Sequence, residues 1–117
     1  MCLRTTQPYQ NKYNLIGGKH ENNESAIEAA YRELKEETGI STNDIHLLHI
    51  MDYFYYDDQL KIEVFAGAVK HEVSLVPEKH PLNWMKLNND FSDKSTFAGE
   101  GNLLHIIEIA LRNLNHT

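Results

Sequence analysis

The chain has 117 residues, of which 41% are hydrophobic and 24% charged, and its formal net charge is −6. This composition predicts one soluble globular domain over residues 1–117, large enough to bury a core. The acidic balance argues against a protein that binds duplex nucleic acid, and no apolar run approaches the roughly 18 residues of a membrane helix. The single cysteine, Cys2, excludes an internal disulfide and favours a reducing, cytoplasmic location.

The first third of the chain predicts two short strands and a helix. Residues 1–4 and 13–16 are short segments of strand character. Residues 25–28 read Ser-Ala-Ile-Glu, a capping box, so a helix should begin at Ser25. Gly39 suits the left-handed position after a helix, and strong helix formers without a proline fill the interval, so the helix should end just before this glycine.

A β-hairpin is predicted next. Residues 46–56 are strand-like and rich in aromatic side chains, and the alternation of apolar residues over 60–68 has the period of a half-buried strand. The segment Asp57-Asp58-Gln59 supplies a turn between them. Alternate residues of the aromatic run at 53–56 are expected to pack against the core rather than to bind a ligand.

The last third predicts a loop, a short strand and a closing helix. A loop with two prolines occupies 77–83, and 84–87 has the character of a short strand with Trp84 in the core. Apolar residues recur at helical spacing over 101–114, so an amphipathic helix should close the chain. No internal repeat or linker divides the sequence.

One segment, residues 18–40, carries a fixed pattern of residue types. It reads GKHENNESAIEAAYRELKEETGI and fits G-x5-E-x7-R-E-U-x-E-E-x-G-U, where U is an aliphatic residue. At seven of these positions the pattern requires one particular residue, so a chance match at a given start is on the order of one in a billion. The fixed positions are Gly18, Glu24, Arg32, Glu33, Leu34, Glu36, Glu37, Gly39 and Ile40.

Three carboxylates of this segment fall on one face of the predicted helix, because Glu36 and Glu37 lie three and four residues after Glu33. Carboxylates held so close repel one another unless a cation lies among them, and a hard divalent ion such as Mg²⁺ prefers oxygen ligands. The alternative is a solvated acidic face on which Arg32 forms ion pairs with Glu36 or Glu28, each worth a few tenths of a kcal/mol. The intact spacing favours the metal site.

The pattern resembles the Nudix box, the strand-loop-helix-loop signature of enzymes that use a divalent metal ion to hydrolyse a diphosphate linked to another moiety. The resemblance implies an α+β fold, the Nudix α/β/α sandwich, with a mixed β-sheet between the box helix and a C-terminal helix. Relatives of this type usually carry one further strand before the segment that residues 1–5 resemble. We therefore expect that an edge strand has been lost or that the chain is truncated.

The resemblance also implies roles for individual residues. Glu36 and Glu37 would bind the metal ion, together with the backbone carbonyl of Gly17. Glu33 would bind metal or act as the general base on the attacking water, and Arg32 would orient the carboxylates. The expected cofactor is Mg²⁺, with Mn²⁺ as the alternative.

Substrate choice depends on weaker features. The run 12–19 is similar to the MutT branch of the family, whose members hydrolyse oxidised purine nucleoside triphosphates such as 8-oxo-dGTP. Asn14 can both donate and accept hydrogen bonds, as the recognition of a purine edge requires. The same resemblance implies substrate contacts from Arg4, Lys19 and Asn102.

A further metal ligand is implied in the loop at 77–83, where Glu78 precedes Trp84 by six residues. Glu100 is the rival for this role. The ordinary alternatives are a strand-end position for Asn14, an exposed arginine for Arg4, loop solubility for Glu78 and helix capping for Asn102.

The predicted function is a metal-dependent pyrophosphohydrolase that cleaves a nucleoside triphosphate, oxidised or not, to the monophosphate and pyrophosphate. The first alternative is a Nudix hydrolase of a dinucleoside polyphosphate, ADP-ribose or a nucleotide sugar. The second is a nucleotide-binding module without catalysis, against which the three intact carboxylates argue. The expected partner is a small-molecule nucleotide, and a homodimer is compatible with the sequence.

Overall fold

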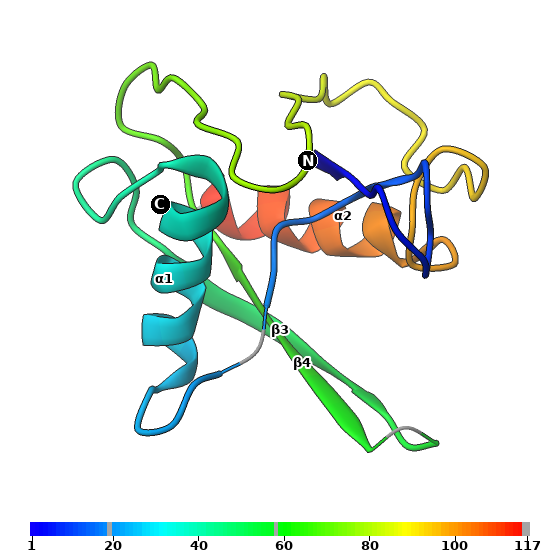
Figure 1. The fold of residues 1–117 in the computed structure, drawn as a ribbon, viewed down its shortest axis with the longest axis horizontal. Coiled ribbons are helices and arrows are strands. Elements are labelled where there is room, and N and C mark those ends of the chain that lie inside the picture. The colour runs from blue at the N-terminus through cyan, green and yellow to red at the C-terminus, as the bar shows by residue number, and fades with distance from the viewer. Residues whose placement is uncertain (19, 58, 116–117) are drawn as a thin grey trace.

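The computed structural model describes residues 1–18, 20–57 and 59–115. Figure 1 shows a long β-hairpin with one end that projects away from the helices. The turn residue Asp58 lies outside the described residues. In chain order the elements are β1 (Cys2–Leu3), β2 (Tyr13–Asn14), α1 (Ala26–Thr38), β3 (Leu48–Tyr55), β4 (Leu60–Ala66) and α2 (Asn102–Leu114). The predicted α+β class is confirmed.

The strands form two antiparallel pairs, β1 with β2 and β3 with β4. Isolated bridges extend the pairing: Cys2 bridges Leu82 in the antiparallel sense, and Tyr13 bridges Phe97 in the parallel sense. The sequence predicted a mixed sheet, with parallel and antiparallel pairing. Among the described residues, the parallel pairing is the single bridge between Tyr13 and Phe97.

Both ends of α1 are fixed by the local signals that predicted them. Oγ of Ser25 accepts a hydrogen bond from the backbone N–H of Glu28 at 3.3 Å, and the carboxylate of Glu28 accepts one from the backbone N–H of Ser25 at 3.2 Å. Gly39 has a φ of 80° and donates its N–H to the carbonyl oxygen of Lys35 at 2.9 Å. A left-handed residue at this position is strained unless it is glycine, so the helix ends here.

Ser25→Ala is expected to lower the free energy of unfolding by about 1 kcal/mol, because the first turn of α1 loses the side chain that accepts its free N–H. Urea denaturation of the variant and the parent chain measures the difference. Ser74→Ala, a substitution at an exposed loop serine, is the matched control. An equal loss in both variants would contradict the capping role.

Two apolar clusters hold the helices against opposite faces of the hairpin. One joins Leu103 and Ile106 of α2 to Val64 of β4, and the other joins Leu34 of α1 to Phe65 of β4. Because successive residues of a strand point to opposite faces, Val64 and Phe65 place the hairpin between the two helices. This is the sandwich that the sequence predicted.

The predicted strand at 84–87 does not form, and Trp84 is not a core residue. The chain pairs with β1 slightly earlier, where Leu3 donates its N–H to the carbonyl oxygen of Pro81 and Asn83 donates its N–H to that of Met1, both at 2.9 Å. Trp84 follows this contact and is 62% exposed. It borders an apolar groove of about 470 Å³, which is also lined by α1 and by the segment after β4.

Candidate active site

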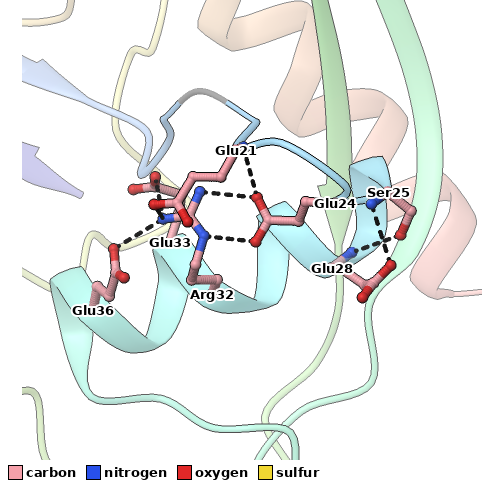
Figure 2. Close-up of polar contacts among 7 residues, drawn as sticks. All are labelled: Glu21, Glu24, Ser25, Glu28, Arg32, Glu33 and Glu36. Atoms are coloured by element: carbon pink, nitrogen blue, oxygen red, sulfur yellow. Dashed lines mark hydrogen bonds and ion pairs between the residues drawn. The ribbon is translucent and has the colours of Figure 1, made fainter.

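Arg32 is the centre of a cluster of carboxylates contributed by α1 and the loop before it (Figure 2). Its Nε donates to one carboxylate oxygen of Glu24 at 2.7 Å, and its Nη2 donates to the other at 3.1 Å. Glu24 in turn accepts a hydrogen bond from the backbone N–H of Glu21 at 2.9 Å. This two-point contact fixes the plane of the guanidinium group and fastens the loop to the helix.

The remaining nitrogen of Arg32, Nη1, is shared among other carboxylates. It lies 2.8 Å from Oε1 of Glu33, 3.1 Å from Oε2 of Glu36 and 3.5 Å from Oε1 of Glu21. One cation therefore holds carboxylates from two turns of the helix and from the loop. Glu28, the other ion-pair partner considered from the sequence, is used in the capping box instead.

These contacts change the pKa values of the paired groups. Hydrogen bonding to Arg32 is the main cause that lowers the pKa of Glu24, with the backbone of Glu21 as the second cause. The pKa of Arg32 is raised further, chiefly by Glu24. The pairing therefore favours the charged form of both groups, which suits a positioning role.

Glu33 lies directly against the glycine loop. A Cβ atom placed on Gly18 would be 2.2 Å from Cδ of Glu33 and 2.4 Å from each of its carboxylate oxygens. By contrast, a Cβ atom on Gly17 would meet nothing within 4 Å. The second glycine is thus the one that makes room for the Glu33 carboxylate beside the backbone of the loop.

Gly18→Ala is expected to keep the fold but to reduce turnover about a hundredfold, because the added methyl group displaces the Glu33 carboxylate from its position. The displaced group is the end of a flexible side chain, so the stability of the chain should change little. Gly17→Ala is the comparison, with a much smaller expected loss. Steady-state kinetics and thermal unfolding of both variants measure this, and equal activity losses would contradict it.

Glu37 is the carboxylate on which electrostatic repulsion acts most clearly. Burial is the main cause that raises its pKa, and the negative charges of Glu33, Glu78 and Glu36 raise it further. A hydrogen bond with the backbone of Gly17 opposes the shift. The charge of the loop residue Glu78 therefore acts on Glu37.

The carboxylate oxygens of this cluster are the ligands that a hard divalent cation such as Mg²⁺ prefers. Such an ion would also relieve the repulsion between Glu37 and the neighbouring carboxylates. Over residues 1–18, 20–57 and 59–115, however, no three His, Cys, Asp or Glu side chains already form a group able to hold a metal ion. Arg32 holds an oxygen each of Glu33 and Glu36. These carboxylates must therefore reorient if they are to share an ion.

Arg4 and Asn14, two of the predicted substrate contacts, are engaged with the backbone near them in sequence. Nε of Arg4 donates to the carbonyl oxygen of Pro8 at 2.6 Å, within the connection from β1 to β2. Oδ1 of Asn14 accepts a hydrogen bond from the N–H of the next residue, Leu15, at 2.8 Å. Both side chains therefore bind nearby backbone, which a substrate would have to replace. Lys19, the third predicted contact, lies outside the described residues.

Asn102 belongs to a second polar cluster, which sequence reasoning missed. Its Nδ2 donates to Oη of Tyr55 at 3.0 Å, and it does not cap α2, whose N-cap residue is Gly101. Beside it, Oη of Tyr9 donates to Glu100 at 3.4 Å. Burial raises the pKa of Tyr9, with Glu100 and Tyr55 adding to the shift, so these side chains share one environment.

Nothing local in the sequence indicates the second cluster, because its contacts join residues 47 and 91 positions apart. Glu100, which the sequence offered as the alternative to Glu78 as a metal ligand, accepts a hydrogen bond from Tyr9. The other residue missed is Glu21, which occupies a variable position of the box pattern. Only the path of the loop brings its carboxylate to Arg32.

No helix in the described part of the chain is long and apolar enough to cross a membrane. The structure is similar to the crystal structure of a MutT/nudix family protein from Enterococcus faecalis, with a TM-score of 0.71 and 18% sequence identity. The match covers 96% of this chain and 52% of that one, so the chain spans about half the length of this structural neighbour. The likeness shows the fold.

A comparison with curated proteins finds no match. The sequence itself matches the family model of the NUDIX domain over residues 1–98, a range that includes the whole Arg32 cluster and the loop that carries Glu78. On this match, which covers most of its length, the chain belongs to the Nudix family.

Proposed function

We propose that this protein is a metal-dependent pyrophosphohydrolase that cleaves a nucleoside triphosphate to the monophosphate and pyrophosphate. The observation that carries the proposal is the cluster in which Arg32 holds Glu24, Glu33 and Glu36 together. Burial, with the negative charges of Glu33, Glu78 and Glu36 added to it, raises the pKa of the neighbouring Glu37. Such unfavourable arrangements are typical of functional sites.

We assign the metal site to Glu36, Glu37 and the backbone carbonyl of Gly17, with Glu78 as a further ligand, and the metal to Mg²⁺. When bound there, a divalent ion neutralises phosphate charge and lowers the barrier to attack on phosphorus. The carboxylates of this face attract a divalent cation. Without the cation, their negative charge would repel a polyphosphate.

Glu33 is the general base of the proposed reaction. Arg32 binds its Oε1, which leaves the other carboxylate oxygen to accept a proton from the attacking water. Arg32 is a positioning residue, because its contacts with Glu24 fix the guanidinium group that in turn orients Glu33. The narrow space beside Gly18 adds a second restraint on the same carboxylate.

The substrate proposal is a purine nucleoside triphosphate, with an oxidised base such as that of 8-oxo-dGTP as the first candidate. The side-chain amides of Asn14 and Asn102 can each donate and accept, as contact with a purine edge requires. Tyr55 and Tyr9 beside Asn102 offer aromatic faces on which a base can stack. Arg4 and Lys19 are the proposed phosphate contacts, and the reducing cytoplasm is the proposed location.

The test is a substrate panel with Mg²⁺ that contains 8-oxo-dGTP, dGTP, ATP, ADP-ribose and a diadenosine polyphosphate. Release of pyrophosphate and monophosphate is measured, with Glu37→Gln as the inactive reference. Preference for 8-oxo-dGTP would support the full proposal. Preference for ADP-ribose or the dinucleotide would overturn the substrate and leave the hydrolase, and no turnover by the folded protein would overturn both.

A further inference from the structure

A shielded carboxylate on β4 faces the side of the hairpin on which α1 packs. Glu63 precedes Phe65 by two residues, so both side chains point to the face that α1 covers. The side chain of Glu63 is 18% exposed, and its Oε2 is closed off from solvent and forms no hydrogen bond with any described residue. Such an oxygen is unfavourable unless a donor or a positive charge lies beside it.

The imidazole of His20, in the loop before α1, supplies that group. Its Nε2 lies 3.2 Å from Oε2 of Glu63, whereas Nζ of Lys61 lies 3.3 Å from the other oxygen, Oε1. Lys61 belongs to β4 itself, so its contact stays within the hairpin. Among the ion pairs and hydrogen bonds of the described residues, only the contact between His20 and Glu63 joins the loop at 17–24 to the hairpin.

The same loop is fastened to α1 on its other side. Glu24 binds Arg32 at two points, and Arg32 in turn holds Oε1 of Glu33. Hydrogen bonding to Arg32 is the main cause that lowers the pKa of Glu24, and the charge of His20 adds to it. His20 therefore lies near enough to act on Glu24. A chain of contacts runs from the hairpin through His20 and the loop to Arg32 and the carboxylate of Glu33.

We propose that His20 and Glu63 are positioning residues, which fix the loop before α1 on the hairpin and so hold Arg32 and Glu33 in place. This role rests on the proposed function, in which Glu33 is the general base. The box pattern assigns neither residue, because His20 occupies one of its variable positions and Glu63 lies outside residues 18–40. A small displacement of a reacting group lowers the rate steeply, so a contact remote from the substrate can govern turnover.

His20→Ala and Glu63→Gln are each expected to lower kcat about tenfold and to change KM for the nucleoside triphosphate less than about twofold. The general base is displaced in these variants, whereas the proposed substrate contacts remain. The double variant should be no slower than the slower single variant, since both changes break one contact. Steady-state kinetics with Mg²⁺ measures all three.

His71→Ala is the matched control. Nε2 of His71 lies 3.0 Å from Oδ1 of Asp44, and the two side chains are 57% and 17% exposed, close to the 51% and 18% of His20 and Glu63. The control thus removes a pair of the same kind and the same burial, but one that does not involve the loop before α1. Its kcat should equal that of the parent chain.

The Arg32→Lys background separates positioning from general damage to the fold. Because the contact with Glu63 acts through Arg32, His20→Ala should lower kcat less than about twofold further in this background. A loss of stability alone would lower kcat by the same factor in both backgrounds. The cycle of parent, two single variants and double variant measures this difference.

Amide hydrogen exchange tests the contact without any measurement of activity. The N–H of Glu21 donates to Oε1 of Glu24 at 2.9 Å, and it should exchange faster in His20→Ala but not in His71→Ala. A His20→Ala variant with the kcat of the parent, a tenfold loss that persists in Arg32→Lys, or unchanged exchange at Glu21 would each overturn the positioning role. A parent chain without turnover would overturn the proposed function and the kinetic role together, while faster exchange at Glu21 would still support the contact.

Discussion

Glu37→Gln is expected to reduce turnover about a hundredfold or more while making the metal-free protein more stable at neutral pH. The loss of activity follows because the proposed metal site loses a charged ligand. The gain in stability follows because burial and the charges of Glu33, Glu78 and Glu36 disfavour the ionised form of Glu37, as its raised pKa shows. A neutral amide of the same shape removes that repulsion.

The pH dependence of this effect has a definite sign. The folded chain binds the proton of Glu37 more tightly than the unfolded chain does, so ionisation costs stability as the pH rises above the ordinary carboxyl pKa of 4.5. The advantage of the variant should therefore vanish below that pH and grow toward neutrality. Thermal unfolding with EDTA, with Glu108→Gln on α2 as control, measures it. A less stable Glu37→Gln at pH 7 would contradict the repulsion.

Arg32→Lys is expected to lower kcat/KM about a hundredfold while it retains a folded chain. Lysine supplies the positive charge but not the planar fork that binds both oxygens of Glu24 and still reaches Glu33. Arg32→Ala should lose stability as well, because the side chains of Glu24 and Glu33, only 13% and 17% exposed, would be left without their cation.

Steady-state kinetics and thermal unfolding of these variants distinguish positioning from charge. Arg112→Lys on α2 is the matched control, since it makes the same exchange at an exposed helix position outside the site. If Arg32→Lys keeps the activity of the parent chain, the bidentate contact with Glu24 does not position Glu33, and the proposed role of Arg32 is wrong.

The helices could be predicted more closely than the strands because their signals are local. The N-cap Ser25 and the left-handed Gly39 directly flank the helix, and both act as the sequence indicated. The segment 84–87 has strand character but finds no partner in the described part of the chain, because β1 pairs with the residues just before it. Strand formation depends on a distant neighbour, which a single sequence does not supply.

In the candidate site, too, contacts within the helix could be predicted and contacts made by loops could not. Helical spacing places Glu33, Glu36 and Glu37 together, and it also predicts the contact between Arg32 and Glu36. The approach of Glu21, the space that Gly18 leaves for Glu33, and the bond between Asn102 and Tyr55 depend on the paths of loops. These contacts become visible only when the loop before α1 and the start of α2 are placed in space.

The most direct test of the central claim is hydrolysis of a nucleoside triphosphate by the purified chain, with Mg²⁺ and with EDTA. The proposed site predicts equal amounts of monophosphate and pyrophosphate with Mg²⁺, and none with EDTA or with Glu37→Gln. Turnover that is unaffected by EDTA and by this substitution, or a folded chain that hydrolyses no diphosphate compound in the presence of the metal, would contradict it.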